Sequence, residues 1–323
     1  MLPHPAVRRA RTLGSLTFFC AIVAAGCSSD STAPPDPVVN PLRATDLIVY
    51  TAFDVTTGRG ATFAITSDGA ARLPLSTASD EVGPEISPDG TRIAAVRLVD
   101  TLPQVFVMNT DGSGDRLAAA VPGGAYWPSW TPDGHSILFT NYDELKTWMM
   151  SADGSGPHQI FTGKEDEQTP ALSPDGQRIV FTSARMFSNT FAVFELYVMN
   201  VDGSNLQRLT TSPEMTWGYN VYPRWSPDGS RIAFIRSIND GVAHVYVMNA
   251  DGSQMRQLTS GDLNDLGVAW SPDGTRLAIA REAMSGLGEI YVTDAADGAH
   301  LVNITNSSDL DERYPSWGRR VTH

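Results

Sequence analysis

Short apolar stretches alternate with turn-forming residues along most of the chain. Residues 222–259 contain four such stretches, YPRWS, RIAFIR, HVYVMN and MRQLT. The middle two are rich in β-branched and aromatic residues, which favour strands. Between the first two, Pro227 presets φ, Asp228 can bond nearby amides and Gly229 tolerates a left-handed backbone. This pattern predicts four antiparallel strands joined by hairpins.

The same pattern recurs along the chain. A Pro-Asp-Gly motif occurs at residues 86–90 (ISPDG), 130–134 (WTPDG), 172–176 (LSPDG), 225–229 (WSPDG) and 270–274 (WSPDG), at intervals of 44, 42, 53 and 45 residues. A second motif containing Asp-Gly follows each copy, as in MNADGSQ at 248–254, and ITSDGA at 65–70 is an earlier copy. Periods of this length are typical of propeller blades.

The two ends of the repeat region predict how the ring closes. Six copies of the second motif indicate six blades, but the first blade opens at DLIVYTAF without an innermost strand. The chain finishes on an innermost strand, YPSWGRR at 314–320, with nothing after it. We therefore expect an all-β, six-bladed propeller of four-stranded antiparallel blades, in which the C-terminal strand joins the N-terminal blade.

These motifs resemble those of a known family. The pattern P-x-W-S-P-D-G-x-x-I-A-F, followed by I-Y-V-M-N-x-D-G-S, is similar to the WD40-like repeats of TolB-type six-bladed β-propellers and covers residues 46 to about 320. The resemblance implies the fold and an envelope protein that binds other proteins. The chain departs from the founding member in having a short tether where that protein has an α/β domain, and in its lipobox.

The N-terminal residues predict export and lipidation. Arg8, Arg9 and Arg11 precede an apolar run, residues 13–25, which is shorter than a bilayer span and favours a secretory signal over a retained anchor. AAGC, residues 24–27, resembles a bacterial lipobox, which implies lipid on Cys27; a free thiol is the alternative. We expect a signal peptide at 1–26, a proline-rich disordered tether at 27–45, a propeller at 46–323, and an outer-membrane location facing the periplasm.

Charge limits the classes of partner. The formal net charge is −13, which becomes −16 without the three arginines of the signal. Such a chain is expected to repel nucleic acid and to attract cations or basic partners, although simple solubility also explains the charge. We expect a monomer that contacts the membrane only through its lipid, without a cofactor.

A binding site is expected on the face that carries the variable loops. The Asp-Gly turns all lie on one face, and the connections of variable length lie on the other, around the channel mouth. Acidic residues gather near this second face, and they predict a site for a metal ion or a basic peptide, or else a solvated rim. They are Asp80, Glu81, Glu165, Asp166, Glu167, Asp262, Asp265, Asp309, Asp311 and Glu312.

The fourth repeat is the longest, and its loops carry apolar groups that suit sugar stacking or a protein hot spot, or else form a local core. The residues assigned to ligand or partner binding are Asp80, Glu81, Glu167, Met186, Phe187, Trp217, Tyr219, Tyr222, Arg224, Asp311, Glu312 and Arg313.

Two repeated features are interpreted as structural. Trp130, Trp225, Trp270 and Trp317 share one strand position with Ile86 and Leu172, which indicates packing between blades. The Asp-Gly turns are expected to bond their own backbone, with Ca²⁺ binding as the alternative.

The sequence favours a binding protein over an enzyme. The histidines outside the signal have no metal-ligand spacing and there is no G-x-S-x-G motif. No catalytic residue is assigned. The alternative is a carbohydrate-active or hydrolytic enzyme with an acidic, Ca²⁺-dependent channel site.

Overall fold

The computed structural model describes residues 46–76, 80–161, 166–188, 191–212, 218–238 and 241–319, with side chains throughout except at 185–188 and 191–192. Within these ranges the chain forms strands and turns, and no helix is long and apolar enough to cross a membrane. The expected signal peptide, the tether and Cys27 lie outside the described residues.

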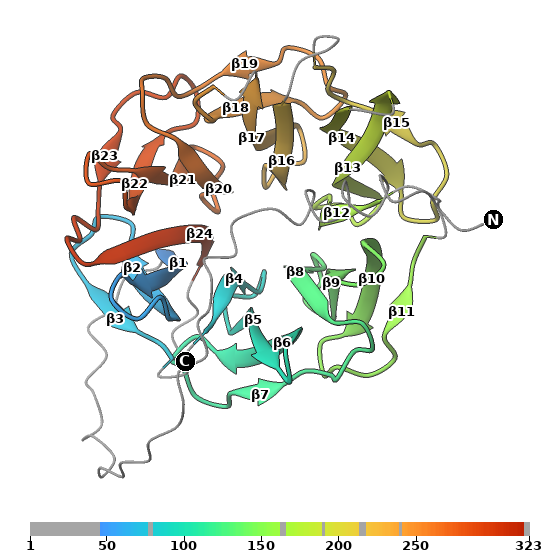
Figure 1. Cartoon of the computed structure of the whole chain (residues 1–323), viewed down its shortest axis with the longest axis horizontal. Coiled ribbons are helices and arrows are strands. Elements are labelled where there is room, and N and C mark those ends of the chain that lie inside the picture. The colour runs from blue at the N-terminus through green and yellow to red at the C-terminus, as the bar shows by residue number, and fades with distance from the viewer. Residues whose placement is uncertain are drawn as a thin grey trace.

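The strands form antiparallel sheets arranged around a central axis (Figure 1). Four of the sheets in the described part of the chain contain four strands each. The first is β24 (Leu310–Arg319), β1 (Asp46–Asp54), β2 (Gly60–Thr66) and β3 (Arg72–Pro74). The second is β4 (Val82–Ile86), β5 (Arg92–Val99), β6 (Leu102–Asn109) and β7 (Arg116–Leu117). The third is β8 (Ala125–Trp130), β9 (Ser136–Asn141), β10 (Lys146–Ser151) and β11 (His158–Gln159). The fourth is β20 (Asp265–Trp270), β21 (Arg276–Glu282), β22 (Gly288–Asp294) and β23 (Val302–Asn303).

The remaining strands form one eight-stranded sheet. Its first half is β12 (Gln168–Leu172), β13 (Arg178–Ser188), β14 (Phe191–Asn200) and β15 (Gln207–Arg208). Its second half is β16 (Gly218–Trp225), β17 (Arg231–Ile238), β18 (His244–Asn249) and β19 (Arg256–Gln257). A single parallel pairing, Phe194 with Tyr219, joins the halves. The described chain is thus an all-β propeller with four separate four-stranded sheets, where six separate blades were expected.

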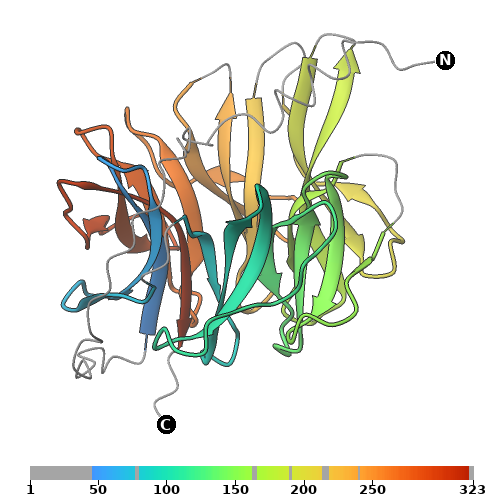
Figure 2. The same ribbon diagram turned by 60° about the horizontal axis from the view of Figure 1, so that its bottom comes forward.

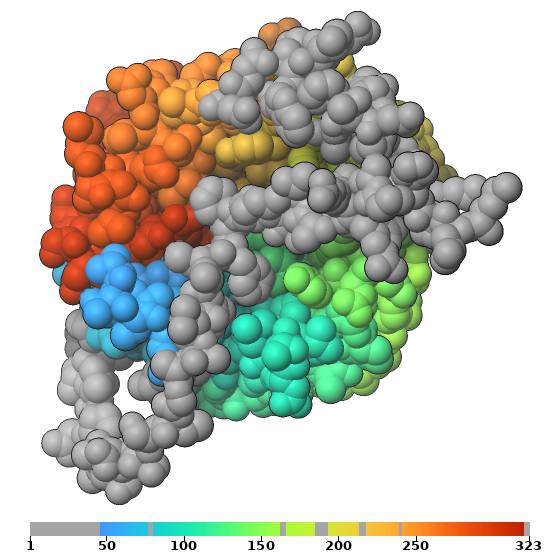
Figure 3. Space-filling view, viewed as in Figure 1, coloured from blue at the N-terminus to red at the C-terminus, as the bar shows by residue number. Residues whose placement is uncertain are grey.

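The last strand pairs with the first. β24 runs antiparallel to β1, with Asp46 opposite Arg319 and Ile48 opposite Trp317. The ion pair of Asp46 with Arg276, at 3.7 Å, places the start of β1 beside a residue that directly follows a Pro-Asp-Gly turn. The start of β1 and the end of β24 therefore lie on the face that carries these turns (Figure 2). In the space-filling view the colours follow one another around the molecule from blue to red, and the blue and red parts lie side by side (Figure 3).

The Pro-Asp-Gly segments form tight hairpin turns, as predicted. The turn glycines have positive φ, 69° at Gly229, and a backbone bond from Gly229 N to Ser226 O closes the turn at 2.8 Å. The carboxylate of Asp228 accepts bonds from the Ser226 hydroxyl at 2.6 Å and from Ser230 N at 3.1 Å. These bonds, the Ser226 hydroxyl first, lower the pKa of Asp228 to about 2. The turn aspartates thus accept hydrogen bonds from residues of their own turns.

The repeated tryptophans join neighbouring blades. Trp130, Trp225, Trp270 and Trp317 are buried, and their expected packing role is confirmed. Three of the indoles donate Nε1–H to a carbonyl of the preceding blade at 2.9–3.1 Å: Trp130 to Glu85, Trp225 to Ala171 and Trp270 to Arg224. An arginine guanidinium lies 4.7–4.9 Å from each ring centroid: Arg92 over Trp130, Arg178 over Trp225, Arg231 over Trp270 and Arg276 over Trp317. Three of the Arg–Trp contacts join separate sheets, and the contact of Arg178 with Trp225 joins the two halves of the eight-stranded sheet. Each adds a cation–π attraction to the buried area.

Deletion of Tyr314–His323 removes most of β24, including the buried Trp317, and exposes the edge of β1. We expect the truncated protein to lose its cooperative thermal transition, because one blade loses its innermost strand and its contact with Arg276. A control that lacks only residues 321–323 should melt like the full chain. Differential scanning calorimetry distinguishes the outcomes, and an unchanged Tm for the longer deletion would contradict this role of β24.

Candidate functional site

Each innermost strand carries an irregularity at a fixed position. The pairing register shifts in β4, β8, β12, β16, β20 and β24 two to four residues before the Trp or aliphatic position. In five of these strands one residue has positive φ and is followed by proline: Gly83, Trp127, Thr169, Tyr222 and Tyr314, with φ of 51° to 61°. Proline disfavours a right-handed helical backbone in the residue before it, and a bulge re-aims that residue's side chain. A left-handed backbone at a non-glycine residue costs about 1–3 kcal/mol.

The bulges bring three aromatic side chains together at the axis. Trp127 of β8 lies 4.9 Å from Tyr222 of β16 and 5.4 Å from Tyr314 of β24, measured between ring centroids. Tyr222 and Tyr314 are 6.2 Å apart. The three strands belong to three different sheets, so this aromatic triad is a contact across the central channel.

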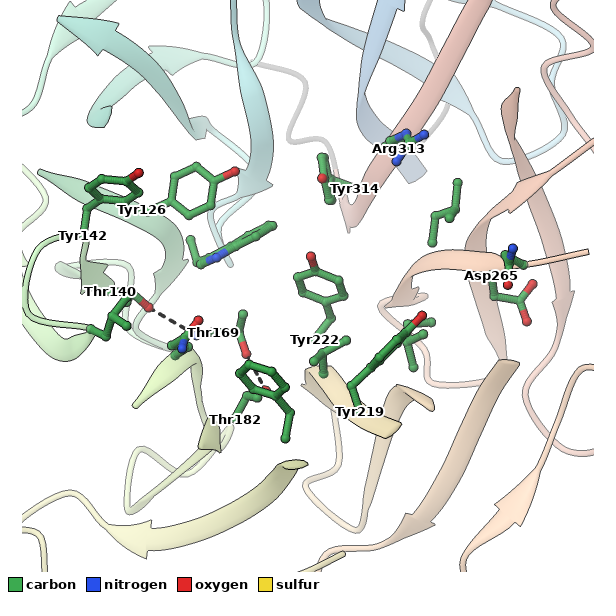
Figure 4. A pocket seen from close by; sticks show the side chains of 18 of the residues that line it. Tyr126, Thr140, Tyr142, Thr169, Thr182, Tyr219, Tyr222, Asp265, Arg313 and Tyr314 are labelled. Carbon is green, nitrogen blue, oxygen red and sulfur yellow. Dashed lines mark hydrogen bonds between the residues drawn. The ribbon is translucent and has the colours of Figure 1, made fainter. Parts of the chain in front are cut away.

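A cavity of about 270 Å³ lies against this triad. We call it the aromatic cup and define it by Tyr126, Trp127, Tyr219, Tyr222 and Tyr314 (Figure 4). Burial raises the pKa of the Tyr126, Tyr222 and Tyr314 hydroxyls. These hydroxyls are therefore neutral at physiological pH and can donate hydrogen bonds.

Polar side chains complete the wall of the cup. Asn264, Asp265 and Glu282 lie on one side, and the amide of Asn264 donates to Glu282 at 2.9 Å. On the other side the Thr140 hydroxyl accepts a bond from Thr169 N at 3.2 Å, and the hydroxyls of Thr169 and Thr182 are 2.9 Å apart. Residues such as Asn264 belong to connections on the face opposite the Pro-Asp-Gly turns, so the cup lies on the variable-loop side of the channel.

Arg313 also lines the cup, and its charge is balanced. Its guanidinium contacts the carboxylate of Asp311 at 2.8 Å. Asp311 also accepts a bond from Gly288 N at 2.8 Å. The hydrogen bond and charge of Asp311 raise the pKa of Arg313 against the opposing effect of burial. The predicted residues Tyr219, Tyr222, Asp311 and Arg313 thus gather at one place.

Two of the predicted acidic residues are buried and form ion pairs within the protein. Glu81 and Glu312 have fully buried side chains. Glu81 forms an ion pair with Arg97 and accepts a bond from Ser76. Glu312 forms an ion pair with Arg72 at 2.8 Å, and burial raises its pKa.

The other predicted residues are spread over the molecule. Glu167 is 2% exposed, and its backbone N–H donates to Leu145 O at 2.7 Å. Asp80 is partly exposed in the loop before β4. Trp217 and the side chains of Met186 and Phe187 lie outside the described residues. The residues that the structure describes therefore include no free ring of carboxylates built from Glu81, Glu167 and Glu312.

Arg224 lies in the channel, as predicted, but on the other side of the aromatic triad from the cup. It contacts Glu85 of another blade at 3.4 Å in a second cavity of about 410 Å³, which Pro88, Pro227 and Pro272 of the Pro-Asp-Gly turns also line. Burial raises the pKa of Glu85, against the opposing charge of Arg224. Arg224 therefore belongs to the opposite end of the channel from Tyr222.

The sequence analysis missed Tyr126, Trp127, Tyr314, Asn264 and Glu282 as site residues. A signal for two of them is present, because Trp127 and Tyr314 each stand immediately before a proline and three residues before a repeated tryptophan. Within the described residues, no group of three or more His, Cys, Asp or Glu side chains is placed to hold a metal ion. The expectation about Ca²⁺ stays a prediction.

Comparisons with known proteins agree on the fold. The model of the TolB beta propeller domain family matches residues 48–217 and 214–320. The crystal structure of TolB from Acinetobacter baumannii is similar, with a TM-score of 0.71 and 21% identity. The match covers 84% of this chain and 66% of the TolB chain, so this chain spans just under two thirds of the length of TolB. Hydrazine synthase from Kuenenia stuttgartiensis has a TM-score of 0.69 and 16% identity over 85% of this chain and 47% of that chain. A chain of the nidogen/laminin complex has a TM-score of 0.67 and 10% identity over 84% of this chain and 98% of that chain. No curated protein matches the chain in sequence.

The strain at the bulges can be measured at Tyr222. Replacing Tyr222 with Gly or with Ala removes the same ring, but only Gly adopts a φ of 56° without cost. We expect Tyr222→Gly to be more stable than Tyr222→Ala by about 1 kcal/mol. At the neighbouring Val221, which does not have positive φ, Ala should be the more stable replacement by about 0.5–1 kcal/mol. Urea denaturation tests both pairs, and the same order at both positions would argue against strain at the bulge.

Proposed function

Because the chain belongs to the TolB β-propeller domain family, we propose that it is a binding module of the bacterial envelope that holds a segment of another protein at the aromatic cup. The observation that carries this proposal is the cup itself. Rigid strands of three sheets place Trp127, Tyr222 and Tyr314 around a cavity on the variable-loop face. Partly exposed aromatic side chains beside polar groups are enriched at protein-binding hot spots.

The size of the cup supports recognition of a small part of a partner. A cavity of about 270 Å³ is at the lower limit of sites that enclose whole small-molecule ligands. It suits a single long side chain or the end of a peptide. The aromatic triad closes the base of the cup, so the anchoring group would enter from the variable-loop face.

We further propose that the ring has six blades. The two halves of the eight-stranded sheet each contain four strands, and only one parallel pairing joins them. Counting each half as a blade gives six, in agreement with the six Asp-Gly motifs. The pairing of β24 with β1 would then complete the ring.

The proposed location follows from the N-terminal sequence and from the position of β1. We propose that residues 1–26 are a signal peptide, that Cys27 is lipidated, and that residues 27–45 tether the propeller of 46–323 to the outer membrane in the periplasm. The start of β1 lies on the Pro-Asp-Gly face. The tether would therefore leave from the face opposite the cup, and the cup would point away from the membrane.

The test is a binding comparison between matched variants. Crosslinking in native envelopes identifies bound proteins, and a purified partner segment is then titrated by calorimetry against the intact domain. We expect Trp127→Ala with Tyr222→Ala to weaken binding at least tenfold, because hot-spot side chains often contribute 2 kcal/mol or more. Val302→Ala, at an exposed site on the outer strand β23, is the control and should bind normally.

Three outcomes would contradict the proposal. The first is equal affinity of the cup variant and the control for the purified partner. The second is binding of envelope glycans in place of protein. The third is hydrolysis of such a glycan, which would support the enzymatic alternative.

A further inference from the structure

We propose that the aromatic cup recognises an ammonium group on an aliphatic stem, such as a lysine side chain of the bound partner. This inference rests on the proposed function and adds the chemistry of the anchoring group. It follows from three features of the cup: the arrangement of aromatic rings, the carboxylates behind one wall, and the pairing of the nearby cations.

The rings form an aromatic floor of the kind that attracts cations. Trp127, Tyr222 and Tyr314 contact one another, and their planes are inclined to one another by 59° to 72°, so a cation would lie over the cavity side of the rings and not between them. Tyr126 lies edge-on to Trp127 at 4.5 Å. The face of an aromatic ring is negative, and cations bind within about 6 Å of its centroid. Inclined rings let more than one face act on a single cation.

The rings of the cup are half-buried, so water screens this attraction only in part. Burial is the largest cause of the raised pKa at Tyr126, Tyr222 and Tyr314 alike. Cation–π attraction increases from about 0.5–1 kcal/mol at exposed sites to about 2 kcal/mol where water is excluded.

The charged wall of the cup favours a positive ligand. Asp265 and Glu282 both line the cavity, and Figure 4 labels Asp265 among the side chains around it. Asp265 is 1% exposed, and its Oδ1 atom has no hydrogen-bond partner within the described residues. Its Oδ2 atom accepts bonds from Val245 N at 3.0 Å and from the Thr259 hydroxyl. One buried carboxylate oxygen on this wall therefore remains incompletely satisfied.

Asp265 already has cationic neighbours, whereas Glu282 does not have one in contact within the described residues. Arg281 Nε lies 3.6 Å from Asp265 Oδ1, and His244 Nδ1 lies 3.7 Å from Asp265 Oδ2. The Arg281 guanidinium donates to Ser260 O at 2.5 Å. Arg313 is paired with Asp311 at 2.8 Å. Glu282 takes its hydrogen bonds from the neutral Asn264, and no cation of the described residues forms an ion pair with it, although its charge acts on Arg313 from a greater distance.

An anionic anchor fits the cup poorly. A carboxylate or phosphate would approach the negative ring faces and the charge of Glu282, and Arg313 would have to leave Asp311. The net charge of −13 would also slow the approach of an anion and speed that of a cation. A purely apolar anchor would leave the charge of Glu282 desolvated and unpaired.

The first arm of the test uses small probes on the intact domain. Choline and its uncharged carbon isostere, 3,3-dimethylbutan-1-ol, have the same shape and differ in charge. We expect isothermal titration calorimetry to show choline binding at least tenfold tighter than the isostere, with affinity that falls as salt rises. Equal affinities for the two probes would overturn the inference.

The second arm uses matched charge variants. Glu282→Gln keeps an oxygen that can accept the Asn264 bond and removes the charge, so choline affinity should fall several-fold. Asp251→Asn removes one charge from an exposed turn on the opposite face and is the control, for which we expect no change. If both variants changed choline affinity equally, the preference for cations would come from the overall charge of the protein. That result would contradict a specific site.

The third arm identifies the source of the ammonium group. Nα-acetyl-lysine amide is compared with its Nε-acetylated form and with glycine amide, which carries only a backbone ammonium. We expect binding of the first alone. Glycine amide binding as tightly would favour a peptide N-terminus over a lysine.

The experiments distinguish a failure of the ammonium inference from a failure of the proposed function. If a purified protein segment binds at the cup and acetylation of all its lysines leaves the affinity unchanged, the ammonium inference fails and the proposed function stands. If choline binds but Trp127→Ala with Tyr222→Ala leaves partner binding unchanged, the proposed function fails.

Discussion

The antiparallel pairing of β24 with β1 is the constraint on which the rest of the structure depends. Two segments more than 250 residues apart in sequence share one sheet, with Ile48 opposite Trp317. The same strand supplies the last of the four Arg–Trp contacts between blades, the one between Arg276 and Trp317. It also supplies Tyr314, the third ring of the aromatic triad. The pairing of the two ends of the chain and the geometry of the site therefore depend on the same strand.

The contacts between blades around the site compensate for the backbone strain within it. Trp127, Tyr222 and Tyr314 each adopt a left-handed backbone that costs free energy. Each lies three residues from a tryptophan that is buried against the neighbouring blade. These tryptophans fix the innermost strand firmly enough for the bulge to persist. The cup is thus a local distortion that a regular and well-packed framework maintains.

Much of the framework could be predicted from the sequence, because its signals are local. Pro227, Asp228 and Gly229 specify a turn through their own backbone preferences, and the same letters recur in each repeat. The tryptophan position could likewise be interpreted as packing, since it alternates with aliphatic residues at a fixed place. The face that carries the cup followed from comparing turn lengths. The merging of two repeats into one sheet through Phe194 and Tyr219 had no such local signal.

The side chains of the site were harder to predict, because their positions depend on register. A bulge changes which side of the strand a residue faces, so Tyr222 reaches the cup while Arg224, two residues later, faces the far end of the channel. Glu81 and Glu312 looked like rim residues from their place in the loops. Their burial depends on Arg97 and Arg72, which belong to distant parts of the sequence.

Hydrogen exchange of the β24 amides, measured by NMR on the full chain, tests the central claim most directly. If the pairing with β1 holds the propeller together, the β24 amides that donate hydrogen bonds to β1 should exchange only through global unfolding. Their opening free energy should then equal that of the buried residues of β21 and show the same dependence on denaturant. Exchange through a local opening of much lower free energy, with β21 still protected, would show that β24 is a detachable edge and would contradict the account.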